Sequence, residues 1–556
     1  MSMHEALFGD YPIPEETARI ALCAFPKGNV YMQIRDQFGM LYQNHQFAHL
    51  FSVEGQPALA PARLALVTVM QYIEGVGDRQ AADNVRDRIS WKYALGLALD
   101  DPGFDFSVLC EFRARLLTDD AELLLFDTLL TLFRDADLLK ARGKQRSDST
   151  HVLAAIRNLH RLENVGETMR HALNRLALVA PAWLRQHANP AWVERYGRRV
   201  EQYRLPKEDA QRQALATTIG EDGYELLDAA FAPTAPPVVQ SEPAIDILRR
   251  VWLQQFYRCD DPSAPLVRQR TTAEQPPSAQ IISSPYDPDA RYKTKRDTSW
   301  IGYKVHLTET CDDDTPNLIT HVATTPATTA DSELTATIQA ELAAKELLPS
   351  EHYLDIGYVD SGILVASEKE HDVRVIGPVI RDPAWQAHIP AGVTIPQFAL
   401  DWDCKQAICP EGKGSRFWNS ARDAHGNDMV VIRFHPDDCG SCLRQSECTK
   451  AKSGARTLSI RPREEHEAIQ AARSRQQTAE FRAAYARRAG VEGTFTQGNH
   501  HSDLRHARYI GLAKVHLQHL LTAIALNLLR AVAWLAEVPR AQTRISAFAA
   551  LMGQTS

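Results

Sequence analysis

The chain has 556 residues, of which 44% are hydrophobic, 24% charged and 8% aromatic, which is the composition of an ordinary globular protein. This composition excludes wholesale disorder, a collagen-like repeat and a small disulfide-dense scaffold. A net charge of −7, from 62 basic and 69 acidic residues, excludes a globally basic coat for nucleic acid, and the length predicts several domains.

Residues 1–140 are predicted to form an N-terminal helical domain. Apolar residues recur near helical spacing across residues 61–74, Asp78 can cap a second helix, and residues 106–117 suit a further one. Short helices joined by polar turns favour a small structural bundle, with a helix-turn-helix unit that contacts DNA as the alternative. The N-terminal segment contains no apolar run, so no signal peptide is expected.

Residues 141–535 are predicted to form an α/β domain. A basic turn leads into a short strand around Asp148, and residues 300–308 and 318–324 alternate in polarity as the strands of a hairpin do. A strand ending at Asp355, a helix and another strand follow. Strands with an interposed helix indicate a mixed sheet flanked by helices.

Two stretches are predicted to interrupt this domain. Residues 157–290 begin with a polar helical run and continue, from Pro233 to Pro243, with prolines that are expected in a linker. Residues 382–465 hold prolines, cysteines and short strands, and no apolar core of their own is evident. Helical periodicity then returns at Glu464 and continues to about residue 490.

The chain closes with an apolar helix and a short tail. Residues 517–535 place leucine, isoleucine and valine side chains on one helical face. Lys514, Arg530 and several other polar residues interrupt the apolar stretch, so no membrane span is expected. Residues 536–556 are left as a C-terminal tail.

Three acidic residues stand near the ends of predicted elements: Asp148, Asp355 and Glu492. Each alone fits an ordinary turn or a helix surface. Together, carboxylates from two adjacent strands and a facing helix could converge on two divalent cations about 3.5–4 Å apart. Hard oxygen ligands suit Mg²⁺, which also binds phosphate oxygens, so the combination favours phosphodiester cleavage.

At these residues the chain resembles the DDE-type transposases of bacterial insertion sequences, which belong to the ribonuclease-H-like integrase superfamily. The stretches QYIEGVGDRQAADNVRDRISWKYALGL and FSVLCEFRARLL are similar to the N-terminal helical domain of that family. Ser147-Asp148-Ser149-Thr150 resembles its first catalytic segment, and Asp355-Ile356-Gly357-Tyr358 its second. The resemblance implies that residues 1–140 bind DNA and that the sheet is a ribonuclease-H-like core.

Tyr485, Arg488 and Glu492 match the third motif of the family, Tyr-x2-Arg-x3-Glu, which puts them within two helical turns on nearly one face. The family pattern continues with a lysine, where this chain has Asn499. Residues 450–514 contain 13 basic and six acidic side chains, which suits either a solvated helical surface or contact with DNA. The candidate DNA-binding residues are Tyr485, Arg487, Arg488, Arg505, Arg508 and Lys514.

Nine cysteines in a chain without a secretion signal favour thiols or metal ligands over disulfides. Cys439-x2-Cys442 has the spacing of a zinc knuckle, and neighbouring cysteines could complete a tetrahedral site for one structural zinc ion. Free thiols in a loop-rich insertion are the alternative. The candidate ligands are Cys404, Cys409, Cys439, Cys442 and Cys448.

The resemblance implies a transposase that uses Mg²⁺ or Mn²⁺ to cut double-stranded DNA at the terminal repeats of its element and to join the ends to target DNA. Asp148, Asp355 and Glu492 would be its catalytic metal ligands. It also implies a homodimer on DNA in the bacterial cytoplasm, associated with the nucleoid. The alternative is a cleavage-deficient or domesticated DNA-binding relative, which the missing lysine favours slightly. A zinc-dependent hydrolase is disfavoured because no HExxH-like run exists.

Overall fold

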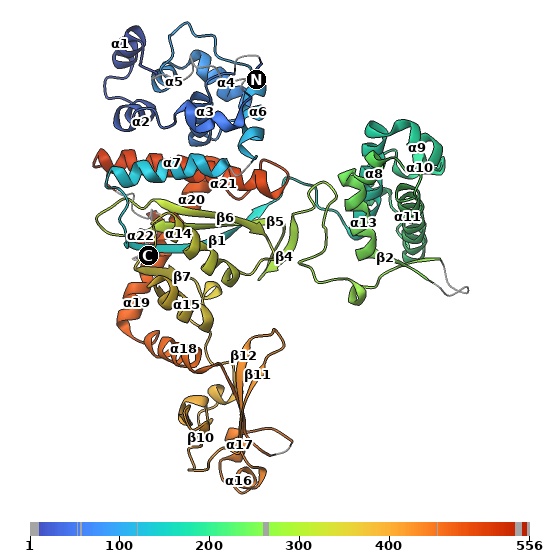
Figure 1. Ribbon diagram of the computed structural model, residues 1–556, viewed down its shortest axis with the longest axis vertical. Coiled ribbons are helices and arrows are strands. Elements are labelled where there is room, and N and C mark those ends of the chain that lie inside the picture. The colour runs from blue at the N-terminus through green and yellow to red at the C-terminus, as the bar shows by residue number, and fades with distance from the viewer. Residues whose placement is uncertain are drawn as a thin grey trace.

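The computed structural model describes residues 11–52, 54–55, 58–118, 121–259, 266–452, 454–539 and 547–552. Within these ranges, N-terminal helices stack on a six-stranded sheet (Figure 1). A second group of helices, drawn in green, lies beyond one edge of the sheet. A segment of short strands lies at the end of the molecule opposite the N-terminal helices. The helical N-terminal region and the mixed sheet between helices fit an α/β core.

The N-terminal helices surround α3 (Pro61–Glu74), most of which is buried. Pro61 occupies its first turn, where a missing N–H costs nothing, and Gly75 ends it with a left-handed φ of +69°. The helix predicted over residues 61–74 is therefore confirmed. The other helices of this region are α1 (Glu15–Ala24), α2 (Val30–Phe38), α4 (Asp78–Asp87), α5 (Ile89–Leu95), α6 (Ser107–Leu116) and α7 (Glu122–Asp135).

The predicted capping role of Asp78 is wrong. Helix α4 follows Gly77 without a side-chain cap. The Asp78 carboxylate instead accepts a hydrogen bond from Gln71 at 2.8 Å and forms an ion pair with Arg113 at 2.5 Å. Arg113 is buried, and a buried charge without a partner costs more free energy than an uncapped helix end, so the carboxylate pairs with Arg113. Asp78 thereby ties α3, α4 and α6 together.

The sheet is mixed, and its central strand is β1 (Lys144–Leu153). On one side β1 pairs antiparallel with β5, and on the other it pairs in parallel with β7, which pairs in parallel with β8. Strands β4 and β6 pair antiparallel with successive parts of β5, so the predicted hairpin and mixed sheet are confirmed. The strands are β4 (Arg291–Lys295), β5 (Thr298–Thr310), β6 (Ile319–Pro326), β7 (Glu351–Leu354) and β8 (Arg374–Ile376).

The longest helix beside the sheet is α21 (Leu512–Leu535), which packs against β6, α3 and α7. By length and composition it is the only helix of the described residues that could cross a bilayer, but 72% of its most apolar window is buried within the protein. Its Asn527 side chain bonds both backbone groups of Ile319, at 2.7 and 2.8 Å. Helix α21 is thus a core helix that joins the sheet to the N-terminal helices.

Further helices follow the parallel strands and lead to the C-terminal part of the domain. Helix α14 (Thr335–Ala344) precedes β7, and α15 (Ser361–His371) precedes β8 and packs on α18 (Arg463–Arg475). The helical run predicted from Glu464 to about residue 490 is not continuous. It consists of α18, α19 (Ala479–Tyr485) and the 3₁₀ segment η9 (Ala486–Gly490), and α20 (Val491–Ser502) follows.

The helices between β1 and the rest of the sheet have an apolar core of their own. Prolines expected in a linker here begin helices instead, since Pro237 and Pro243 occupy first-turn positions that need no N–H donor. Gly223 lets two of these helices approach closely, because a Cβ there would lie 2.0 Å from the Trp252 ring. The helices are α8 (Arg161–Val179), α9 (Pro181–His187), α10 (Ala191–Tyr196), α11 (Asp209–Ala230), α12 (Pro237–Gln240) and α13 (Pro243–Gln255).

The cysteine-bearing segment is built from short strands and single-turn helices. Contrary to expectation, it does have a small apolar cluster, which includes Phe398, Ile432, Phe434 and Leu458. Alternation along β12 points Val430 and Ile432 to the same, buried face. The strand is so short that this alternation is hard to recognise in the sequence. Its elements are β9 (Ala399–Asp401), β10 (Gln406–Ile408), β11 (Phe417–Arg422), β12 (Asp428–Arg433), α16 (Pro436–Gly440), α17 (Gln445–Cys448) and β13 (Thr457–Ile460).

Candidate active site

Asp148 and Asp355 lie side by side because β1 and β7 are parallel neighbours. Ser147 is paired with Leu354 in that ladder, so each aspartate is the residue after a paired position. Asp148 stands in the middle of β1, whereas Asp355 is the first residue beyond β7. The sheet thus brings together two carboxylates that are far apart in the sequence.

Glu492 reaches the same place from a different element than expected. It is the second residue of α20, not the end of a long helix. The chain breaks before it because the side chain of Thr478 caps a new helix, accepting the N–H of Phe481 at 3.1 Å. Gly490 then lets the backbone pass directly over Arg146, since a Cβ there would lie 2.0 Å from the guanidinium.

Arg488 is the cation at which the carboxylates meet. Its Nη2 contacts Oδ2 of Asp148 and lies 3.9 Å from Oδ2 of Asp355. Its Nη1 lies 3.4 Å from Oε1 of Glu492, one helical turn ahead. The Tyr485 hydroxyl donates to Oδ1 of Asp355 at 3.4 Å. The structure therefore brings all five of these predicted site residues together.

The three carboxylates differ in depth. The side chain of Asp148 is 10% exposed, that of Asp355 37% and that of Glu492 60%. Burial raises the pKa of Asp148 to about 6; the guanidinium of Arg488 opposes this rise, and the charges of Asp355 and Glu492 add to it. Three carboxylates thus share a single guanidinium, and the cluster carries an excess of negative charge.

The other predicted DNA-binding residues have partners elsewhere. Arg487 pairs with Asp313 at 2.8 Å and also bonds the carbonyl of Cys311. Arg508 donates to the carbonyls of Gly75 and Val76 at the end of α3. Arg505 is half-buried and Lys514 is exposed. Across the described residues, none of these four makes an ion pair with the three carboxylates.

A second charged pair beside Asp148 was not identified from the sequence. Lys304 on β5 contacts Asp331, and Ser149 lies 3.4 Å from the same carboxylate. Asp331 is the first residue of the 3₁₀ segment that precedes α14. The available signal was a lysine between apolar residues in the alternating stretch that forms β5.

The donor chemistry at the carboxylates fits a hard cation. Oxygen ligands from Asp148, Asp355 and Glu492 surround a position that a guanidinium partly occupies, and Mg²⁺ or Mn²⁺ prefers such ligands. Among the described residues, however, no three His, Cys, Asp or Glu side chains converge tightly enough to form a ready-made metal site. Metal binding here would require the carboxylates to close in.

Four cysteines line one cavity of about 260 Å³: Cys409, Cys439, Cys442 and Cys448. The Sγ of Cys409 accepts the N–H of Lys413 at 3.4 Å, and that of Cys439 accepts the N–H of Arg456 at 3.5 Å. The fifth candidate ligand, Cys404, is exposed and does not line the cavity. Its backbone N–H donates to the Asp401 carboxylate at 2.8 Å. The thiols are gathered but do not close on a common point.

Comparison with known families gives two matches. Residues 21–115 match a family model described as a transposase domain (DUF772), and residues 408–532 match one described as a transposase DDE domain. The second match contains Glu492 and the four cysteines of the cavity, whereas Asp148 and Asp355 lie outside it. No curated protein matches the chain. The two matched domains are consistent with a DDE-type insertion-sequence transposase and indicate a transposase.

Proposed function

We propose that the protein is a DDE-type transposase that cuts and joins DNA with Asp148, Asp355 and Glu492 as its catalytic carboxylates. The observation that carries this is their meeting around Arg488, from β1, the end of β7 and the start of α20. The strand order supports a ribonuclease-H-like core. Strands β1, β5 and β6 are antiparallel, and β7 and β8 join the other side of β1 in parallel.

The three carboxylates would hold Mg²⁺ or Mn²⁺. Bound there, the metal ions would activate the attacking water or 3′-hydroxyl and stabilise the leaving oxyanion. Arg488 has a planar guanidinium that can bind two phosphate oxygens, so it would hold the scissile phosphate against the carboxylates. Burial raises the pKa of Tyr485 to about 12, so its hydroxyl stays protonated and can donate to a carboxylate or to DNA.

The N-terminal helices would hold the terminal repeat of the element near this site. Their attachment to the catalytic segment supports this. The Ser502 hydroxyl at the end of α20 donates to the carbonyl of Tyr72 at 2.9 Å, and Arg508 donates to the carbonyl of Gly75, the residue just after α3. A duplex held by these helices would lie near α20, which carries Glu492. Arg487, Arg505 and Lys514 would contact its phosphates and make affinity salt-dependent.

The domain division that we propose follows the same reasoning. Residues 1–140 bind DNA, and residues 141–535 form the catalytic domain, interrupted by a helical segment at 157–290 and a cysteine-rich insertion at 382–465. Residues 536–556 form a tail that lies partly outside the described residues. We place the protein in the cytoplasm with the nucleoid, acting as a homodimer that pairs two ends. A cleavage-deficient relative is not favoured by the transposase DDE match.

The cysteine cavity would hold one structural zinc ion. Thiolates at the spacing of Cys439 and Cys442 suit zinc, and two backbone N–H groups already point at sulfur atoms of this cavity. The apolar cluster of this segment has eight buried side chains among the described residues, which are few for independent folding, and zinc would offset this.

The test is a cleavage assay with DNA that carries the sequences flanking the gene. With Mg²⁺ the protein should release a 3′-hydroxyl at the element boundary, and EDTA should prevent this. Asp355→Ala should retain binding of the same DNA without cutting it. Wild-type protein that binds the ends but never cuts them would contradict the proposal and favour the DNA-binding relative.

A further inference from the structure

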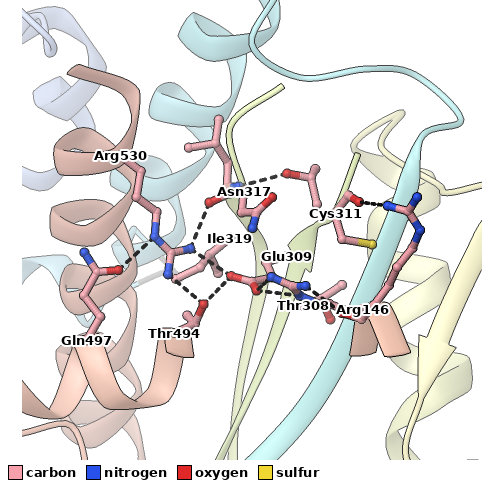
Figure 2. Close-up of polar contacts among 12 residues, drawn as sticks. Arg146, Thr308, Glu309, Cys311, Asn317, Ile319, Thr494, Gln497 and Arg530 are labelled. Carbon is pink, nitrogen blue, oxygen red and sulfur yellow. Dashed lines mark hydrogen bonds and ion pairs between the residues drawn. The ribbon is translucent and has the colours of Figure 1, made fainter. Parts of the chain in front are cut away.

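A fully buried glutamate lies beside the candidate active site, on the neighbouring strand β5. Glu309 on β5 is 0% exposed, and both of its carboxylate oxygens are fully bonded (Figure 2). Oε1 accepts from Nε of Arg146 at 2.7 Å. Arg146 on β1 and Glu309 on β5 lie directly opposite each other in the strand pairing. Oε2 accepts from the Thr494 hydroxyl at 2.5 Å and from Nη1 of Arg530 at 2.8 Å.

Two partners of Glu309, Arg146 and Thr494, hold the two ends of the segment 487–494. Arg146 donates its Nη1 to the carbonyl of Arg487 at 2.6 Å, and Thr494 lies on the first turns of α20. The segment 487–494 is therefore held at its first residue by Arg146 and at its last by the bond from Thr494 to Glu309. This segment contains Arg488 and Glu492. Figure 2 shows Thr494 and Arg530 approaching Glu309 from one side and Arg146 from the other.

The same network reaches the strand that bears the first aspartate. Arg146 and Asp148 are two residues apart on β1, so they point to the same face of the sheet. Arg530 adds a link to α21, since it donates to Gln497 at 3.0 Å, to Thr494 at 2.6 Å and to the carbonyl of Asn317 at 2.8 Å. One carboxylate thus connects β1, η9, α20 and α21.

Stability alone does not account for a buried charge in this position. Removing a carboxylate and two guanidinium groups from water is costly, and apolar residues of similar volume are often equally stabilising. Burial would raise the pKa of Glu309, but the charges of Arg530 and Arg146 outweigh that effect and keep it below its ordinary value. The ionised group offers what an apolar side chain cannot, which is a fixed direction for each of its bonds.

We infer that Glu309 is a positioning residue that sets the distance and orientation of Arg488 and Glu492 relative to Asp148. This inference rests on the proposed function of that site. Glu309 touches no reacting atom itself, and it acts through Arg146 and Thr494. A displacement of about 1 Å in such a constellation can cost about 100-fold in rate.

Two variants test this positioning role, and they differ in how much they disturb the fold. Glu309→Gln removes the charge and leaves two buried cations with a weaker partner. Thr494→Val keeps the volume and removes only the bonds of the Thr494 hydroxyl to Glu309 and Arg530. Each should lower the single-turnover cleavage rate about 10- to 100-fold at saturating DNA and raise the Mg²⁺ concentration needed for half-maximal rate. The dissociation constant for end DNA should stay within about twofold, because no DNA contact is removed.

The matched control is Asp222→Asn, which weakens a buried ion pair with Arg195 at 2.7 Å in the helical segment away from the sheet. It should lower the melting temperature without changing cleavage. A purely structural role for Glu309 predicts that pattern for Thr494→Val too. Wild-type cleavage rates in folded Thr494→Val, with an unchanged Mg²⁺ requirement, would overturn the inference even if Glu309→Gln does not fold.

Hydrogen exchange keeps the test independent of activity. Amides of residues 487–494 should exchange faster in Thr494→Val than in wild type, and Asp222→Asn should leave them unchanged. If wild-type protein does not cut DNA, the proposed function fails while the exchange result still decides whether the network holds this segment. Unchanged exchange across residues 487–494 would contradict the positioning role itself.

Discussion

Arg488 contacts the carboxylate of Asp148 although 340 residues separate them in the chain. The arginine also lies within 4 Å of Asp355 and Glu492. An exposed i,i+4 pair with Glu492 alone would be worth only about 0.3–0.5 kcal/mol. Its position beside all three carboxylates gives Arg488 a larger role in holding the cluster together, in addition to the phosphate binding that we propose.

Replacing Arg488 should therefore separate cleavage from folding. We expect Arg488→Ala to lower single-turnover cleavage strongly and DNA binding modestly, and Arg488→Lys to recover only part, because a point charge replaces a planar fork. Without metal, Arg488→Ala leaves three carboxylates facing one another, so its melting temperature in EDTA should fall. Mg²⁺ should then raise it by more than it raises that of wild type. Full activity in Arg488→Ala would mean that the Tyr-x2-Arg-x3-Glu match is fortuitous at its arginine.

Each carboxylate variant should lose cutting and keep binding. Asp148→Ala, Asp355→Ala and Glu492→Ala each remove a carboxylate that we propose as a metal ligand and not as a reader of base sequence. Cleavage of end DNA with Mg²⁺ and a gel-shift titration of the same DNA measure the two properties separately. Normal cutting by any one of the variants would remove that residue from the catalytic set.

The buried histidines should make the fold sensitive to mild acid. Burial lowers the pKa of His306, His352 and His519 to about 3, so they stay neutral in the folded state. In the unfolded chain a histidine takes up a proton below about pH 6.5, so the unfolded state binds more protons there. Stability is therefore full above that pH and falls as the pH drops, at about 1.4 kcal/mol per pH unit for each histidine, until the folded pKa is reached.

His352→Gln tests this dependence, because His352 is fully buried and lies 2.7 Å from the Ser147 hydroxyl. Melting temperatures at pH 7.5, 6.5 and 5.5 should fall less steeply for the variant than for wild type. The exposed His45 provides a matched substitution, His45→Gln, which should leave the wild-type pH dependence unchanged. Parallel curves for wild type and His352→Gln would show that His352 does not contribute.

Zinc should depend on the cavity cysteines and not on Cys404. Elemental analysis of freshly purified protein should give about one zinc ion per chain. Cys439→Ser should lose it, and Cys404→Ser should retain it because Cys404 lies outside the cavity. No zinc in wild type, with all five thiols titrating freely, would leave the free-thiol alternative.

The close approach of α11 and α13 predicts a local packing defect. Gly223→Ala would put a Cβ 2.0 Å from the Trp252 ring, so one helix must shift, at a cost of about 1–3 kcal/mol. Thermal unfolding of the full chain followed by tryptophan fluorescence measures the loss. The comparison is Gly440→Ala, whose added Cβ meets open space and should be neutral. Gly412 also faces open space but is unsuitable, because its φ of +78° would strain any side chain.

Local patterns predicted much of the fold but not its breaks. Alternation identified β5 and β6, and helical spacing identified α3, because each pattern reflects one buried face. The interruptions before Glu492 depend on Thr478 as a cap and on Gly490 against Arg146, which are tertiary facts. Periodicity passes over both, since the polarity of the side chains does not change there.

The candidate site was predictable where a motif carries it and not where packing does. Asp148, Asp355 and Glu492 follow from short motifs, and the parallel pairing of β1 with β7 brings the first two together. Glu309 carries no motif, and a charge in a sequence is ordinarily assigned to the surface. Only the three-dimensional positions of Arg146 and Arg530 explain why a glutamate can be fully buried.

The place of β1 in the chain affects how the protein emerges from the ribosome. β1 ends at Leu153, and its antiparallel partner β5 begins at Thr298, so about 145 residues must be made before the two can pair. At about 5–20 residues per second, both edges of β1 stay open for on the order of 10 s. The strand KQRSDSTHVL is mostly polar, which keeps it soluble during this time, and the intervening helices can fold on their own core meanwhile. Strand β1 is thus made early, and its polar sequence makes it a poor template for aggregation before its neighbours are made.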